Sequence, residues 1–259
     1  MVALGSFQRH SLVLEKLLNF ETLESFAHFL HSPLPQEVAI VGGFDLPFGL
    51  PRELVEHLQW PTDWLPCMQH YTALSRAEIR DTFKTFCDAR PVGGKFAHRA
   101  TDTPAGSSPS MKWVNPPVAF MLHAGVPLLM QAGASLPGLH PGDPGKVALE
   151  AYPGLLAREI LGPRSYKSDD KAKQTPERLL ARKDVLSALE RGQTRLALRL
   201  KLSTVLSEHL VQDPSGDALD APLCLMQAAW AAHQHLHHPT PTGYGLPDFD
   251  PLEGWIVSA

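Results

Sequence analysis

An unbroken apolar run that ends on a carboxylate is the feature that most constrains the fold of this chain. Residues 38–45 read VAIVGGFD, and the next segment, LPFGLP, is stiffened by Pro47 and Pro51. Apolarity without alternation over this length is typical of a strand that helices cover on both faces. Asp45 then stands at the end of a covered strand, where a charge costs several kcal/mol unless it is ion-paired, hydrogen-bonded or bound to a metal. The run predicts an α/β fold with an acid at one end of its sheet.

The same pattern returns at residues 147–152, VALEAY, where Glu150 lies inside an apolar strand that a Pro-Gly pair closes. Residues 2–8 and 12–20 both look extended, and the short turn between them predicts a hairpin. Apolar spacing and capping residues predict three long helices, and the tail predicts an edge strand. The helices are expected at residues 21–31, where Pro33 and Pro35 end the helix, at 176–191 and at 216–235, and the strand at 254–258. This order of elements indicates a mixed sheet flanked by helices.

The stretch between the two apolar strands, residues 47–145, has weaker periodicity and reads as a long, mainly helical insertion. A capping box, S-x-x-E, announces one helix after Ser75. The Asn-Pro pair at 115–116 begins another. A chain of 259 residues is long enough to bury a sizeable core, and we expect a single domain, residues 1–259, that contains this insertion.

Composition and charge indicate a soluble protein of the cytoplasm. Three cysteines lie far apart without C-x-x-C spacing, which fits a reducing compartment. The first residues show no signal-peptide pattern, and the longest apolar stretch, residues 118–130, is shorter than the roughly 20 residues that span a bilayer. The net charge is −4, but residues 158–201 alone carry twelve basic and six acidic side chains. This segment reads either as a surface for polyanions such as nucleic acid or as a solvated helical face.

Four acidic residues are candidates for one catalytic site: Asp45, Glu150, Asp217 and Asp220. Asp217 and Asp220 stand three apart, so that on a helix both project from one face near its N-terminus. Like charges at this separation repel, and a divalent cation would turn that repulsion into binding. Because Mg²⁺ and Mn²⁺ prefer oxygen ligands, we expect one of these ions at Asp45, Asp217 and Asp220.

Each acid also has a structural interpretation, which the sequence leaves open. Asp217 follows Ser215, a plausible helix cap, and an acid in a first turn gains about 0.3–1 kcal/mol from the helix dipole. Asp45 would form an Asx turn by accepting hydrogen bonds from backbone amides of the loop that follows it. Glu150 would form a buried salt bridge with an arginine of the insertion such as Arg99.

Several segments of the chain resemble the uncharacterised family called domain of unknown function 429, whose members are predicted nucleases with a ribonuclease H-like fold. The matching segments are GGFDLPFGLPRELVE, WP, SPSMKWVNPP, LEAYPG, SYK, GDALDA and EGWI. They follow the family's order over nearly the whole chain, and GFDLPFGLP together with DALDA is the most specific part. The resemblance implies a mixed five-stranded sheet, with Asp45 at the end of the fourth strand, Glu150 on the next strand, and Asp217 with Asp220 at the start of the last helix.

The chain departs from this family at its beginning. Relatives start with a strand of the type GVDF, which contributes a first aspartate at the centre of the sheet, whereas this sequence starts at MVALG. We therefore expect the first strand of a ribonuclease H-like sheet to be missing. Two interpretations stay open: the start lies further upstream, or a tail strand at 254–258 completes the sheet.

These observations together favour metal-dependent hydrolysis of phosphodiester bonds in nucleic acid. Two ions at the acids would activate a water and stabilise the leaving oxygen, while Lys167 and Arg99 hold the phosphate backbone. Lys167 has an alternative interpretation as an ordinary exposed lysine. The alternative function is a non-catalytic protein that binds nucleic acid or another ligand on the same fold.

Overall fold

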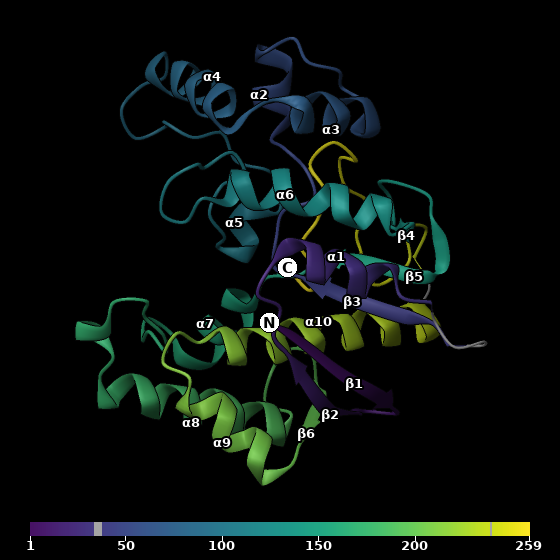
Figure 1. The fold of residues 1–259 in the computed structure, drawn as a ribbon, viewed down its shortest axis with the longest axis vertical. Coiled ribbons are helices and arrows are strands. Elements are labelled where there is room, and N and C mark those ends of the chain that lie inside the picture. The colour runs from purple at the N-terminus through teal and green to yellow at the C-terminus, as the bar shows by residue number, and fades with distance from the viewer. Residues whose placement is uncertain (34–37, 239) are drawn as a thin grey trace.

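The structure is a computed structural model that describes residues 1–33, 38–238 and 240–259. These residues form a mixed α/β protein with ten α-helices, one short 3-10 helix and six strands (Figure 1). The strands make two separate three-stranded sheets, ordered β1-β2-β6 and β3-β5-β4, where the resemblance implies one sheet of five strands. None of the helices within the described residues combines the length and the apolarity needed to cross a membrane.

The first sheet begins with the predicted hairpin. β1 (Val2–Gln8) and β2 (Ser11–Leu18) pair antiparallel, and β6 (Arg199–Lys201) joins the far side of β2 in parallel. Since β1 pairs with β2 alone in the described part of the chain, its other edge is open.

The second sheet carries the two apolar strands. β3 (Ile40–Phe44) and β5 (Asp143–Glu150) pair in parallel with Phe44 opposite Glu150, and the short β4 (Ala134–Ser135) lies on the other side of β5. The two carboxyl ends therefore meet at one edge, as the sequence predicted. The expectation that both faces of residues 38–45 are covered is wrong, because Val38 and Ile40 are 47% and 43% exposed and no residue of β3 is fully buried.

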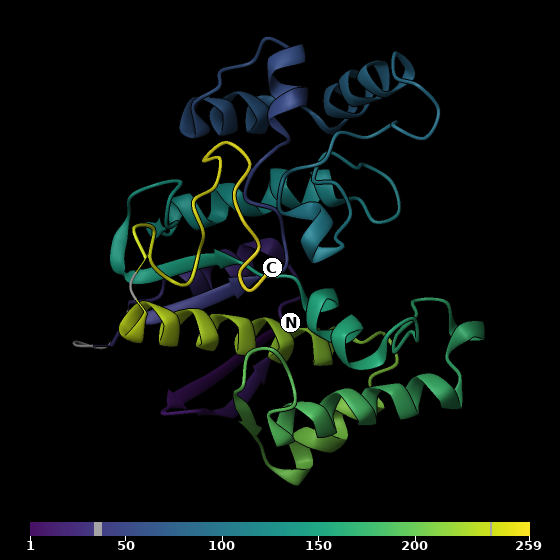
Figure 2. The same ribbon diagram turned by 180° about the vertical axis from the view of Figure 1, so that it is seen from behind.

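The last long helix, α10 (Asp217–His237), packs against both sheets and lies between β3 and the β1–β2 hairpin (Figure 2). Gly43 allows the closest approach: a Cβ atom there would lie 2.5 Å from the carbonyl oxygen of Cys224. Gly5 on β1 permits a close approach within the hairpin instead: a Cβ there would lie 2.3 Å from the carbonyl oxygen of Val13 and 3.3 Å from Leu225 of α10. This packing sets the end of β3 beside the start of α10.

Residues 47–145 are mainly helical, as predicted, and they build a hydrophobic cluster around Tyr71, Phe83 and Leu122. Both hydrogen bonds of the predicted capping box at Ser75 are present. The helices of this stretch are α2 (Arg52–His57), α3 (Trp64–Ala73), α4 (Arg76–Asp88), α5 (Asp102–Ala105) and α6 (Val118–Gln131).

The remaining helices are α1 (Leu23–His31), α7 (Pro153–Leu161), the 3-10 helix η1 (Lys171–Lys173), α8 (Pro176–Arg191) and α9 (Thr204–Gln212). Of these helices, α1 packs against α6, whereas α7, α8 and α9 pack against α10, β6 or one another. α8 begins and ends where the sequence predicted, with Gly192 in the left-handed conformation at its C-terminus. Of the two prolines expected to end the first helix, Pro33 follows α1, and Pro35 lies outside the described residues.

The expected tail strand at 254–258 is reduced to an isolated bridge between Ile256 and Glu150. Since Phe44 occupies the other side of Glu150, the tail lies on the β4 side of β5 and does not join the two sheets. Buried Ile256 and Val257 hold it against the core. The interpretation that the tail completes a central sheet is therefore wrong for the described residues.

Candidate functional site

A pocket of about 480 Å³ opens where the ends of β3 and β5 meet α6, α7 and the loop after α7. Asp45 lines it directly after β3, and Glu150 lines it at the end of β5. Lys167 and Tyr166 reach it from the loop after α7. Asp220 lies behind them in the first turn of α10.

Asp45 is the acid in this group without a partner. Its side chain is accessible from the pocket, and among the described residues it forms no hydrogen bond or ion pair. Asp45 is exposed to solvent, yet the protein groups packed around its carboxylate displace part of its hydration. This desolvation, with the charge of Asp220, raises the pKa of Asp45 to about 7. The Asx-turn interpretation is wrong, because the backbone amide of Phe48 in the following loop donates to Glu150 instead, at 2.9 Å.

Asp220 is buried, and both of its carboxylate oxygens have partners. The hydroxyl of Tyr166 donates to Oδ1, and the ammonium of Lys167 pairs with Oδ2. Burial raises the pKa of Asp220 although Lys167 acts against it. Burial also opposes the charge of Lys167, but Asp220 and Asp45 outweigh it and raise the pKa of Lys167. Lys167 therefore forms an ion pair with Asp220 and is also stabilised in its charged form by Asp45. An ordinary exposed lysine, the alternative interpretation, would have neither acidic neighbour.

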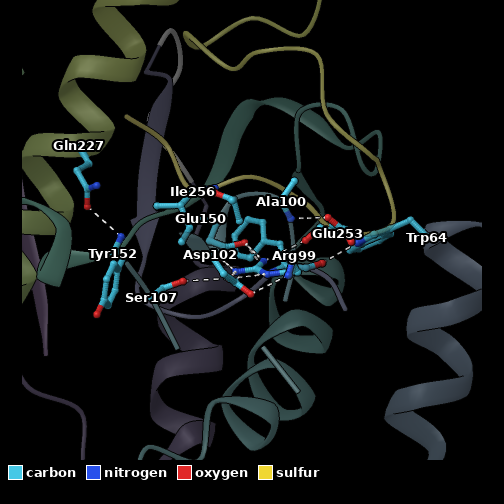
Figure 3. A network of polar contacts seen from close by, with 12 residues as sticks. Trp64, Arg99, Ala100, Asp102, Ser107, Glu150, Tyr152, Gln227, Glu253 and Ile256 are labelled. Atoms are coloured by element: carbon cyan, nitrogen blue, oxygen red, sulfur yellow. Dashed lines mark hydrogen bonds and ion pairs between the residues drawn. The ribbon is translucent and has the colours of Figure 1, made fainter. Parts of the chain in front are cut away.

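Glu150 belongs to a buried ion pair, as the structural interpretation expected (Figure 3). The two terminal nitrogens of Arg99 donate to its two oxygens at 2.8 and 2.7 Å. Arg99 also donates to Asp102, and all three side chains are at most 3% exposed. Burial raises the pKa of Glu150 and Arg99 opposes that shift. Both residues line the pocket, but the donors of Arg99 and the oxygens of Glu150 are already engaged with protein partners.

The C-terminal tail is tied to the same ion pair. Arg99 donates to the backbone carbonyl of Glu253 at 3.0 Å, and the Glu253 carboxylate accepts from the backbone amide of Ala100 at 2.7 Å. The backbone amide of Ile256 donates to the hydroxyl of Thr101 at 3.0 Å. The tail therefore fixes the segment that carries Arg99.

Asp217 faces away from the pocket. It is exposed and lines a second hollow of about 470 Å³ together with Asp213 and Ser215. Its charge still acts on Asp45 and Asp220, whose pKa values it helps to raise. Two side chains accept from backbone amides of the first turn of α10: the Asp213 carboxylate accepts from Ala218 at 2.8 Å, and the Ser215 hydroxyl, the cap that the sequence suggested, accepts from Asp217 at 3.4 Å.

The donor set fits Mg²⁺ or Mn²⁺ better than a metal that needs a full protein cage. Within the described residues there is no group of three or more His, Cys, Asp or Glu arranged to hold a metal. Mg²⁺ needs less, because it keeps several waters and is commonly held by one or two carboxylates with substrate phosphates. Among the described residues, Asp45 has no protein partner and is accessible to such an ion, whereas Tyr166 and Lys167 engage both oxygens of Asp220.

Tyr152, Arg158 and Tyr166 line the pocket and were missed as site residues by sequence reasoning. The signal for the two tyrosines was their place in the segments LEAYPG and SYK, and for Arg158 its place at the start of the basic segment 158–201, since an isolated tyrosine or arginine has no characteristic spacing. Comparisons with protein-family models, with curated proteins and with solved structures found no match for this chain. The site is therefore interpreted from its own geometry.

Proposed function

We propose that this chain is a metal-dependent hydrolase of phosphodiester bonds in nucleic acid, with Mg²⁺ or Mn²⁺ held by Asp45 and Asp220. The observation that supports it is the unpartnered carboxylate of Asp45, placed at the pocket beside a second acid. Desolvation, together with the charge of Asp220, raises the pKa of Asp45, and a divalent cation bound there would stabilise the ionised carboxylate against both effects. The carboxylates at the strand ends and the start of α10 also agree with the family resemblance.

The residues have separate roles in this proposal. Asp45 and Asp220 bind the ion, and Tyr166 holds the Asp220 carboxylate in place through its hydroxyl. The bound ion supplies Lewis acidity and lowers the pKa of a coordinated water. Lys167 lines the pocket and, once separated from Asp220, has an ammonium available for a phosphate oxygen. Asp217 adds negative charge without lining the pocket.

Arg99 and Glu150 have a structural role in this proposal. Their bidentate ion pair satisfies both charges and anchors the Phe48 amide just after Asp45. We therefore expect substitutions of Arg99 or Glu150 to lower the stability of the fold, and to lower activity only because the loop after Asp45 is displaced.

Cleavage of an end-labelled, single-stranded oligonucleotide in Mn²⁺ tests this function. We expect Asp45→Asn and Asp220→Asn each to lower the cleavage rate by about a hundredfold or more, because each removes a charged ligand. Asp81→Asn is the matched control: it removes an exposed acid of α4 whose partner among the described residues is Arg80. Cleavage that persists in EDTA, or that Asp45→Asn leaves unchanged, would contradict the proposal.

A second candidate is a non-catalytic nucleic-acid-binding protein on the same scaffold. It is favoured by one observation, namely that both oxygens of Asp220 already have protein partners. Such a protein would bind nucleic acid equally well in EDTA and in Mn²⁺ and would cleave neither DNA nor RNA. The same oligonucleotide, measured for binding and for cleavage, separates the two candidates.

A further inference from the structure

The pocket beside Asp45 receives opposite kinds of side chain from different elements. α7 and the loop after it supply three cations, Arg158, Arg164 and Lys167. The start of α6 supplies apolar groups instead, including Val118 and Met121. A pocket that joins cations to an apolar surface is suited to a ligand that is anionic at one end and planar or apolar at the other.

Arg158 is the pocket cation that lacks an acidic partner in the described part of the chain. Arg164 pairs with Asp184, and Lys167 pairs with Asp220. Arg158 instead donates from Nη2 to the backbone carbonyl of Ala105 at 2.5 Å. Its charge is therefore held in position without being neutralised.

The guanidinium of Arg158 lies over the ring of Tyr152, with its central carbon 5.3 Å from the ring centroid. Two glycines make room for this pair. A Cβ at Gly106, whose φ is +59°, would lie 2.8 Å from Nη2 of Arg158, and a Cβ at Gly154 would lie 2.6 Å from Cζ of Tyr152. The local sequence thus fixes a cation on an aromatic ring at the pocket wall, with guanidinium N–H groups left to donate.

The size of the pocket limits what enters it. About 480 Å³ lies within the range of sites that hold one small ligand, and it is far too small for a double helix. A base inside a duplex is stacked and paired, and it reaches a pocket only after leaving the stack at a cost of a few kcal/mol. An unpaired nucleotide enters without that cost.

We propose that this pocket receives one unpaired nucleotide of single-stranded nucleic acid, with its phosphate on Arg158 and its base against Val118 and Met121. This inference rests on the proposed function for the reaction, and it adds the class of substrate. A phosphate contact carries no sequence information, and apolar contact with Val118 and Met121 offers no hydrogen bonds that would distinguish one base from another. The site therefore selects unpaired strands with little preference for sequence.

Fluorescence anisotropy in EDTA, where a metal-dependent reaction is stopped, tests the inference. The probes are a labelled mixed-sequence oligonucleotide and the same oligonucleotide annealed to its complement. We expect the single strand to bind about tenfold tighter or more. Equal affinity for the duplex would overturn the inference.

Arg158→Gln tests the phosphate contact, with Arg191→Gln as the matched control. Arg191 is an exposed arginine at the end of α8, in the same basic segment, and does not line the pocket. Arg158→Gln should weaken single-strand binding about tenfold and reduce the slope of log K against log salt by about 0.7. Arg191→Gln should stay within about twofold of the unaltered protein, because it removes general charge only. Equal effects of the two variants would show a diffuse basic surface and overturn the inference.

Met121→Trp tests the apolar side of the pocket. Met121 is 38% exposed, so a larger side chain can be tolerated by the fold while it fills the pocket. We expect weaker single-strand binding with an unchanged salt slope, since no phosphate contact is lost. Unchanged binding in a variant with an unchanged melting temperature would place the base elsewhere and contradict the proposal.

The inference and the proposed function fail in different ways. Mn²⁺-dependent cleavage of duplex as fast as single strand would overturn the inference and leave the hydrolase proposal intact. Arg158-dependent binding of single strands without any cleavage would overturn the hydrolase proposal and leave the inference about the nucleotide pocket intact.

Discussion

Replacing Arg99 by methionine should be among the most damaging single substitutions in this chain. The Arg99 side chain is 1% exposed, and it donates to Glu150, to Asp102 and to the backbone carbonyl of Glu253. Methionine fills similar space but leaves two buried carboxylates without a counter-charge. Removing one partner of a buried ion pair typically costs about 3–5 kcal/mol.

The same arrangement predicts strong coupling between Arg99 and Glu150. Glu150→Gln alone should also destabilise the fold, because Arg99 then keeps only Asp102 as an acidic partner. The double variant should lose less than the sum of the two single losses, with a coupling energy of about 1–3 kcal/mol. The loss in Arg99→Met should shrink as the pH falls, because the stranded carboxyl groups take up protons.

Urea unfolding, followed by the fluorescence of the five tryptophans, measures these effects. With a slope of about 1–3 kcal/mol per M urea, a loss of about 4 kcal/mol moves the midpoint by more than about 1 M. A shift below about 0.3 M in Arg99→Met would refute the reasoning, because it would mean that the buried carboxylates do not need the arginine.

Three further substitutions have expected outcomes. Asp45→Asn should raise the melting temperature near pH 8 by about 2–4 °C and leave it unchanged near pH 4. The pKa of Asp45 is about 7 in the folded protein and 3.8 for the free group, so the folded protein loses stability as the pH rises between these two values. Burial and neighbouring histidines lower the pKa of His233 from 6.5, so stability should fall as the pH drops below about 6.5, and His233→Asn should lessen that fall in thermal melts. Gly43→Ala places a Cβ 2.5 Å from the carbonyl oxygen of Cys224, and we expect a loss of about 1–3 kcal/mol in urea unfolding together with weaker Mn²⁺ binding.

The sequence predicted local features of the fold well because their causes are local. The capping box at Ser75 and the Gly192 end of α8 depend on residues within one helical turn, and both are present. Where the two apolar runs end is also local information, because proline-containing segments follow both of them in the sequence. Capping residues and the ends of apolar runs can be read along the chain, whereas the parallel pairing that brings the ends of β3 and β5 together joins segments far apart in it.

Long-range partners were beyond the same reasoning. Nothing near Asp220 announces that Tyr166 and Lys167, more than fifty residues earlier, take its two oxygens. The Asx turn at Asp45 was a reasonable local prediction, but Glu150, 102 residues away from Phe48, takes the amide of the loop. The division of the strands into two sheets likewise depends on where α10 packs.

Calorimetric titration of Mn²⁺ near pH 8 tests the central claim most directly, because it detects the cation whether or not a reaction follows. The account predicts binding heat from the unaltered protein and none from Asp45→Asn. It predicts tighter binding in Lys167→Met, because that variant lacks the ammonium group that competes with the cation for Asp220. Absence of heat from the unaltered protein, or equal heat from Asp45→Asn, would contradict the claim that these carboxylates form a cation site.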